Sequence, residues 1–347
     1  AELNQISLLV ENKQWWAEYI LKIKKDYLEN LQVKLDNILT EKLLKVESNL
    51  DKLPLNSEAI YAYINFSNSL MNLNLINLKS NTYKEYFSNK KINQKTAELL
   101  STAIHKSRKL EDQQALVIAT GSLARLYELQ VLRTENLMQQ KLNLSIAKKL
   151  TEQALLLSNE INADQREILY RHRHQLGRIQ KAQGDIEVAL SSYAEAWNIL
   201  ESLRADLVTN ADNQFSFRQN VEPIYREFID LLLQADRDKI DLGKLVLRRK
   251  SKALTNPLDI ARLVMQSLQL AELDNFFQEP CSPPVAKPVQ IDENDQDAVV
   301  IYPIILKNRL EVILYRSGEK TTSDSFPVNE DEVKKALEGL ANIIYDN

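Results

Sequence analysis

The sequence has few of the residues that interrupt helices or cross-link small folds. Its 347 residues include one cysteine, six glycines and nine prolines. A single cysteine excludes an internal disulfide and is typical of a reducing compartment, so we expect a cytoplasmic location. Few glycines and prolines leave few points at which a helix must end. This scarcity predicts a mostly α-helical chain with long helices.

The sequence also has few residues that bind metals and no glycine-rich loop that could bind a phosphate. The only histidines are His105, His172 and His174, and with Cys281 they are too few for a typical zinc site. His172 and His174 are two positions apart, so on a helix they point to different faces. The chain also lacks a glycine-rich phosphate loop. We therefore expect no metal site and no cofactor.

Membrane and nucleic-acid partners are disfavoured by the hydrophobic and charged residues. No apolar run approaches the ~20 residues that a membrane span needs. The first residues, AELNQISLLVENKQWW, lack the layout of a signal peptide, and the absence of an initial Met is typical of a processed form or an excised fragment. A formal charge of −4 gives no electrostatic reason to bind nucleic acid.

One short stretch carries the signature of a helical hairpin. In LGRIQKAQGDIEVALSSYAEAW (Leu176–Trp197), Gly184-Asp185 can end one helix and begin the next. Small residues at Gly177, Ala189 and Ala196, with Tyr193 between, let paired helices approach closely. This spacing resembles the tetratricopeptide repeat. The alternative is that the stretch forms a single helical hairpin in an ordinary bundle.

A second copy upstream favours a repeat array over a lone hairpin. GSLARLYE resembles the first helix of a unit, with Ala124 at the small position, and AKKLTEQALLLS resembles the second, with Ala147 and Ala154. The clearest repeats are thus 117–158 and 170–203. Eleven extra residues near LQVLRTENLMQ are expected to lengthen the upstream hairpin.

Weaker copies extend the pattern over residues 1–277. A lone repeat cannot bury its apolar face, so we expect four to five helical pairs stacked as an α-solenoid. Residues 3–50 are helical in pattern, with a predicted core of Trp15, Trp16, Tyr19 and Ile23. The other expected helical segments are Glu47–Asn74 with a turn at Leu53-Pro54, Lys95–Gln114, Phe215–Gln234 and Pro257–Phe277, with a lysine-rich connection between the last two.

The composition changes after the helices. Residues 278–297 are rich in proline and are expected to form a linker. Residues 298–347 then switch to strand-like character: Val299–Leu306 and Arg309–Tyr315 predict a β-hairpin, and Asn329–Asn347 predicts an amphipathic helix. A hairpin and one helix are too little for a stable domain, so we expect the chain to end inside a second domain.

Several segments together resemble the cyanobacterial TPR–CHAT proteins (caspase-like, HetF-associated with TPRs). They are QFSFRQNVEPIYRE, KLTEQALLLS, SLQLAELDNFF and VIYPIILKNRLEVIL, and the resemblance covers roughly residues 47 to 347. It implies that residues 298–347 begin an α/β caspase-like CHAT domain with a His–Cys dyad further along. No His or Cys follows Pro288, and Cys281 lies in the linker before the first strand. We therefore expect this fragment to be non-catalytic and its parent protein to be a cysteine peptidase.

Two functions remain open on the sequence. In a protein-recognition solenoid, the first helices line a concave face, and a basic lining favours an acidic peptide or a C-terminal carboxylate. A solvated helix face, with charges that keep the protein soluble, is the more common explanation of such residues than a dedicated binding site. In the alternative, the helices hold or oligomerise the CHAT domain, and a homo-oligomer without an external peptide is expected. The predicted lining residues are Arg125, Arg171, His174, Arg178 and Lys181.

Overall fold

The computed structural model is mostly helical, with a small antiparallel sheet after the helices. The chain divides into two compact units, residues 1–168 (unit 1) and 169–347 (unit 2). None of the helices in the described ranges combines the length and apolar character needed to cross a bilayer. The structure describes residues 2–6, 9–10, 25–74, 89–158, 166–208, 221–235, 256–277 and 299–345.

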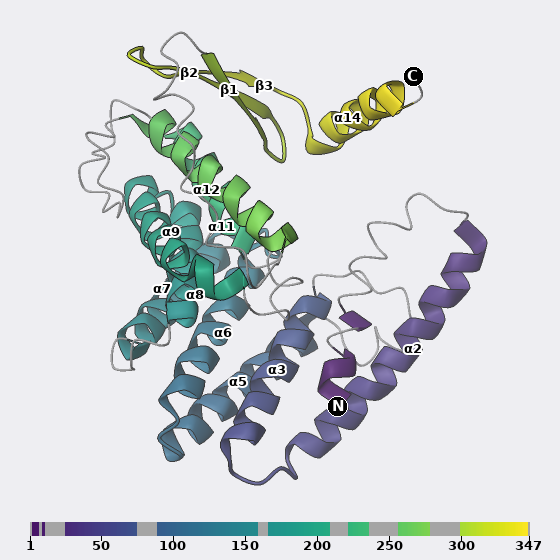
Figure 1. The fold of residues 1–347 in the computed structure, drawn as a ribbon. Coiled ribbons are helices and arrows are strands. Elements are labelled where there is room, and N and C mark those ends of the chain that lie inside the picture. The colour runs from purple at the N-terminus through teal and green to yellow at the C-terminus, as the bar shows by residue number, and fades with distance from the viewer. Residues whose placement is uncertain are drawn as a thin grey trace. The chain divides into compact units, whose positions relative to one another are not determined.

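Unit 1 is built from helices that pack against their neighbours in sequence. Contacts join α3 to α5, α5 to α6, and α6 to α7 (Figure 1). The predicted turn at Leu53-Pro54 is confirmed, and Asn56 caps the following helix through its Oδ1, which accepts from the Ala59 N–H at 2.9 Å. The helices are α2 (Lys25–Leu50), α3 (Ser57–Asn74), α5 (Asn89–Lys109), α6 (Gln113–Val131) and α7 (Leu137–Ser158).

The hairpin of α6 and α7 is long, as the extra residues predict. Helix α6 continues to Val131 and α7 begins at Leu137, so most of the extra residues extend the helices. The expected helix Lys95–Gln114 is wrong at its end, because α5 stops at Lys109. Glu111 has a φ of 55°, and the Asp112 carboxylate accepts from the Ala115 N–H at 3.0 Å, which starts α6.

Unit 2 contains the hairpin that the sequence predicts. Gly184 separates its two helices with a φ of 88°, a value that glycine adopts without strain. Helix α9 packs on α11 and α12, which also pack on each other. The helices are α8 (Arg166–Gln183), α9 (Ile186–Val208), α11 (Glu222–Gln234) and α12 (Pro257–Phe277).

The small residues singled out in the sequence lie in the interior, and one of them lies at a very close contact between helices. A Cβ placed on Gly177 would lie 2.8 Å from Cδ2 of Tyr193, so α8 and α9 meet at a distance that only glycine allows. All six of the small positions singled out in the sequence are buried: Ala124, Ala147, Ala154, Gly177, Ala189 and Ala196. The prediction that these positions face neighbouring helices, and not water, is confirmed.

Among the described residues, three strands follow the helices, one more than the sequence predicts. The predicted hairpin is confirmed, with Leu306 N–H donating to the Arg309 carbonyl at 2.9 Å across the turn. The sheet order is β1-β2-β3 and both pairs are antiparallel. The elements are β1 (Val299–Ile305), β2 (Leu310–Arg316), β3 (Thr322–Phe326) and the predicted amphipathic helix, α14 (Glu330–Tyr345).

One face of the sheet belongs to the core of unit 2. Tyr302, Ile304 and Ile313 are buried in one apolar cluster with residues of α9, α11 and α12. The Tyr302 hydroxyl accepts from Gln266 of α12 at 2.8 Å. The helices of unit 2 therefore hold the sheet directly.

Some predictions fall on residues outside the described ranges. These are the expected core residues Trp15, Trp16, Tyr19 and Ile23, the lysine-rich connection, and the proline-rich linker with Cys281.

Candidate functional site

The predicted basic residues of α8 face α11 within unit 2. His174, Arg178 and Lys181 recur every three or four residues, which places them on one side of a helix. Helix α11 presents Glu227 and Asp230, three residues apart, on the side that meets them. The basic side of α8 therefore meets an acidic side of the same chain.

The first contact is a partly buried hydrogen-bond network around Glu227. Its Oε2 lies 2.8 Å from His174 Nε2 and accepts from the Tyr193 hydroxyl, also at 2.8 Å. Arg178 Nη1 lies 3.0 Å from His174 Nδ1. These distances fit a histidine whose Nε2–H donates to Glu227 while its Nδ1 accepts from Arg178. The network joins α8, α9 and α11.

The environment of Glu227 keeps its carboxylate ionised. Burial by itself raises the pKa of this group, but the hydrogen bond from His174 and its charge once protonated, the positive charge of Arg178 and the hydrogen bond from Tyr193 lower the pKa to about 2. Its ionised form therefore stabilises unit 2 above pH about 4.5, and this stabilisation is lost as pH falls through about 2.

A second contact extends from α8 to the sheet. Asp230 Oδ2 accepts from Lys181 at 3.0 Å, and its Oδ1 lies 2.7 Å from Arg309 Nη2 at the start of β2. Arg309 Nε also donates to Glu311 at 2.6 Å. Burial raises the pKa of Asp230, and Lys181 and Arg309 outweigh that effect and lower it. The chain of charges Lys181–Asp230–Arg309–Glu311 thus connects α8 and α11 to the sheet.

The two other predicted lining residues lie elsewhere. Arg171 is exposed on α8, with its guanidinium carbon 5.8 Å from the centre of the Tyr170 ring. Arg125 is half-buried on α6 and donates to Asn72 of α3 at 3.1 Å. The structure therefore brings His174, Arg178 and Lys181 together, and Arg171 lies at an exposed position of the same helix. A binding role for these residues stays a prediction.

Sequence reasoning missed the acidic partners of the basic row. Glu227, Asp230 and Arg309 are not among the predicted site residues. The available signal was the pair of carboxylates three positions apart in a helix whose other side is strongly apolar. That spacing says that both carboxylates share a side of α11, although it does not say which helix they meet.

His172 is buried in unit 2 and makes no hydrogen bond through its Nε2. Burial lowers its pKa to about 4, against the weaker effect of a hydrogen bond with Gln175. The histidine is therefore neutral at pH 7. No group of three or more metal-binding side chains occurs in the part of the chain that the structure describes.

We predict that mild acid destabilises unit 2 through His172. Its folded-state pKa lies below the value of 6.5 expected when unfolded, so the unfolded chain binds more protons between pH 6.5 and 4. Stability is present above pH 6.5 and falls by about 2 kcal/mol from pH 7 to pH 5. Urea unfolding of unit 2, followed by hydrogen exchange in α8 and α9, measures this slope.

His172→Gln is expected to flatten this pH dependence. The matched control is His105→Gln, because His105 is exposed on α5 in unit 1. An unchanged slope in His172→Gln, or an equal change in the control, would contradict the assignment.

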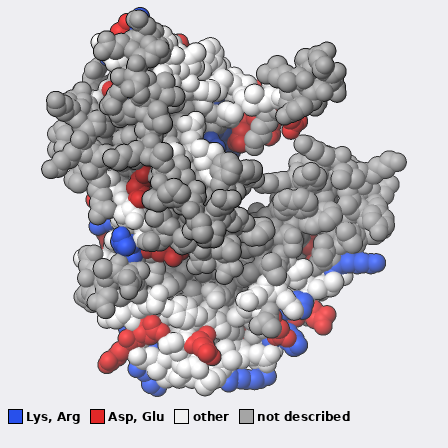
Figure 2. Space-filling view, in the orientation of Figure 1, with Lys and Arg blue, Asp and Glu red and all other residues white. Residues whose placement is uncertain are grey.

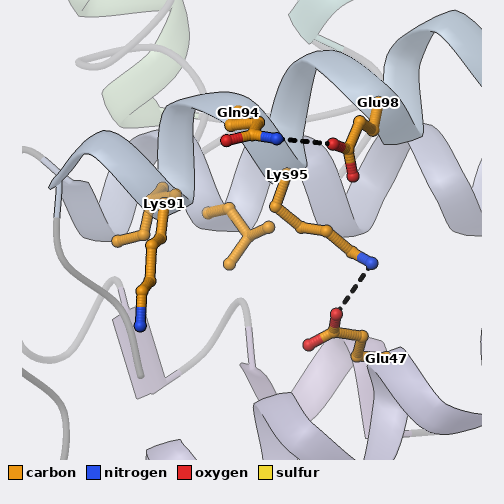
Figure 3. Close-up of a pocket in the computed structure, with 7 residues that line it drawn as sticks. Glu47, Lys91, Gln94, Lys95 and Glu98 are labelled. Atoms are coloured by element: carbon orange, nitrogen blue, oxygen red, sulfur yellow. Dashed lines mark hydrogen bonds and ion pairs between the residues drawn. The ribbon is translucent and has the colours of Figure 1, made fainter. Parts of the chain in front are cut away.

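A pocket of about 230 Å³ lies in unit 1 (Figure 3). Lys95 of α5 points toward Glu47 of α2, and their Nζ and Oε1 atoms are 2.8 Å apart. Gln94 donates to Glu98 along α5 at 3.1 Å. The pocket thus contains opposite charges that pair within the chain. Its lining residues are Glu47, Leu70, Lys91, Ile92, Gln94, Lys95 and Glu98.

The described surface visible in Figure 2 carries mixed charge. Basic and acidic side chains are mixed over it, most clearly where unit 1 is exposed.

A comparison with models of protein families finds none that matches the chain, and a comparison with curated proteins finds no match either.

Proposed function

We propose that the helices form a TPR-type α-solenoid. In this proposal the solenoid is the protein-binding region of a caspase-like CHAT cysteine peptidase and recognises or positions its partner or substrate. What supports the solenoid is the close approach of α8 and α9 at Gly177, together with the burial of all six small positions in two separate hairpins. Paired helices that bury small residues against their neighbours are the unit of such arrays.

The assignment of residues 298–347 to the start of a CHAT domain rests on the resemblance. It is supported by an antiparallel hairpin and a following helix in the expected order. The His–Cys dyad of that domain is not among the residues of this chain, because no His or Cys follows Pro288. In this proposal the fragment recognises or positions a protein, and catalysis belongs to the parent protein.

An acidic peptide remains the proposed partner class, with a constraint on where it binds. At Arg178 and Lys181 it must compete with Glu227 and Asp230 of α11. Among the predicted lining residues of α8, Arg171 is the exposed one. Arg171 is therefore the residue at which an acidic ligand is best tested.

We predict saturable binding of a fluorescent hexaglutamate peptide to the full chain. Arg171→Glu should weaken binding about tenfold, because it removes a donor pair and adds repulsion. Lys149→Glu makes a similar charge change at an exposed site of α7 and should leave affinity unchanged. Fluorescence anisotropy at two salt concentrations measures both.

A scaffold that binds no external peptide is the second candidate. It is favoured by the contacts that join helices to the sheet: Asp230 with Arg309, Gln266 with Tyr302, and Arg226 with the Ile305 carbonyl at 3.4 Å. Absence of saturable hexaglutamate binding, or equal weakening by the two variants, would contradict the acidic-ligand proposal and favour this scaffold.

A further inference from the structure

The Asp230 carboxylate of α11 is shared by donors from three parts of unit 2. Its Oδ2 accepts from Lys181 of α8 at 3.0 Å. Its Oδ1 lies 2.7 Å from Nη2 of Arg309, directly before β2, and accepts from Gln234, one turn further along α11, at 2.6 Å. Two of these donors are cations, so one carboxylate balances a charge on a helix and a charge on the sheet.

The two cations differ in how firmly they are held. Arg309 is 16% exposed, and its Nε also donates to the buried Glu311 at 2.6 Å. A planar guanidinium can contact two carboxylates at once, which fixes Arg309 between Glu311 and Asp230. Lys181 is 33% exposed in the last turn of α8, and the exposed residues 182–185 follow it. Its flexible side chain can turn toward a ligand while its backbone stays in place.

Sharing of Asp230 lowers the free energy that is needed to release Lys181. The Asp230 side chain is only 22% exposed, so loss of all its charged partners would leave its carboxylate poorly solvated. With Arg309 in place, Asp230 keeps a cation and the Gln234 amide when Lys181 leaves. Without Arg309, the same release leaves the neutral Gln234 amide as the donor that the structure shows for Asp230. Arg309 therefore determines how easily Lys181 is freed.

The contact around Glu227 offers no such release. Glu227 is bound by His174, whose side chain is 8% exposed, and by the Tyr193 hydroxyl. Tyr193 belongs to the apolar core of unit 2 and stacks on Phe228. An acidic ligand can therefore gain Lys181 at a lower free-energy cost than His174.

We propose that Arg309 is a positioning residue for the basic row of α8: it holds Asp230 so that Lys181 can pass from this carboxylate to an acidic ligand. Lys181 lies ten positions from Arg171, about 15 Å along the helix, and an extended six-residue peptide of about 20 Å spans that distance. When the ligand is bound, Asp230 belongs to Arg309 and Gln234. The inference rests on the proposed function for the nature of the ligand, whereas the sharing of Asp230 is tested without it.

A double-mutant cycle in stability tests the sharing of Asp230. Lys181→Met should raise the unfolding constant of unit 2 about twofold in the wild-type chain, because Asp230 keeps Arg309. In the Arg309→Met chain the same change should raise it about tenfold. Urea unfolding of the full chain, followed by hydrogen exchange in α8 and α11, measures all four chains. Equal effects of Lys181→Met in the two backgrounds would overturn the proposal.

The cycle can also be run if Arg309→Met does not fold. Loss of Arg309 removes the partner of the buried Glu311, which is a cost unrelated to Lys181. Glu311→Gln in all four chains removes that charge. The twofold and tenfold effects of Lys181→Met are expected in this background too.

Binding of the fluorescent hexaglutamate peptide tests the release of Lys181. Arg309→Met should weaken binding about fivefold, although Arg309 is not on α8, because Lys181 then stays with Asp230. In the Asp230→Asn chain the same substitution should leave affinity unchanged, since the carboxylate that holds Lys181 is gone. Arg316→Met, which removes a charge from the other end of β2, is the matched control and should leave affinity unchanged.

Failure of this inference differs from failure of the proposed function. Equal weakening by Arg309→Met in the wild-type and Asp230→Asn chains would indicate a long-range effect of charge and would overturn the release of Lys181. A wild-type chain that binds no hexaglutamate would contradict the acidic-ligand function. In that case the stability cycle decides whether Arg309 frees Lys181.

Discussion

Gly177→Val is expected to destabilise unit 2 by about 3 kcal/mol. Even a single Cβ at this position would lie 2.8 Å from Cδ2 and 3.0 Å from Cε2 of Tyr193. The Tyr193 ring has little room to move, because it stacks on Phe228 at 6.2 Å and its hydroxyl is bound to Glu227. Valine therefore forces α8 and α9 apart. Urea unfolding with hydrogen exchange in the two helices measures the loss.

Alanine substitutions at two helical glycines supply the control. A Cβ on Gly339 of α14 has no heavy atom within 4 Å, so Gly339→Ala should stabilise its helix by up to about 1 kcal/mol. Gly177→Ala should instead destabilise, by about 1–2 kcal/mol, because the clash outweighs the gain in helix propensity. Equal effects at the two glycines would contradict the close-contact explanation.

The helical pairs were predictable because local residues specify them. Gly184 supplies the backbone conformation that ends α8, and the small residues that meet across the hairpin lie within about twenty positions of each other. The extra residues near the upstream turn lengthen the hairpin as predicted, since most of them extend α6 and α7. The error at the end of α5 also has a local cause: the turn at Glu111 and the cap at Asp112 lie inside a run of helix-forming residues.

Strand β3 was not predictable from its own residues. Its sequence, TSDSF, has no apolar alternation, and none of its residues is buried. It is a strand because it pairs with β2 from Leu310↔Phe326 to Leu314↔Thr322. Pairing with a neighbouring strand overrides a weak intrinsic preference in this case.

Only the basic residues of the site were predicted from the sequence, and not the acidic residues that they contact. The spacing of His174, Arg178 and Lys181 correctly places them on one side of α8. Their acidic partners come 53 residues later for His174 and 49 for Lys181, on a helix whose position depends on packing of the whole unit. Helical periodicity shows which residues share a side, whereas only the tertiary fold shows which side they meet.

Glu227→Leu is expected to destabilise unit 2 by about 3 kcal/mol. The substitution removes the acceptor that the Tyr193 hydroxyl and the buried His174 share, and it removes a negative charge that attracts Arg178. We expect a value at the lower end of the range for removing one member of a buried pair, because the Glu227 side chain is 36% exposed. Denaturant unfolding at pH 7 measures it.

Glu222→Leu is the matched control on the same helix. Glu222 pairs with Arg226 at 2.5 Å, and this arginine keeps Glu272 at 3.7 Å and the Ile305 carbonyl at 3.4 Å as partners, so this change should cost only about 1 kcal/mol. Tyr193→Phe provides a sharper test. If the orphaned hydroxyl causes part of the loss, Tyr193→Phe should be less damaging in the Glu227→Leu background than in the wild type. Strictly additive effects would show that Tyr193 and Glu227 do not stabilise unit 2 through this hydrogen bond.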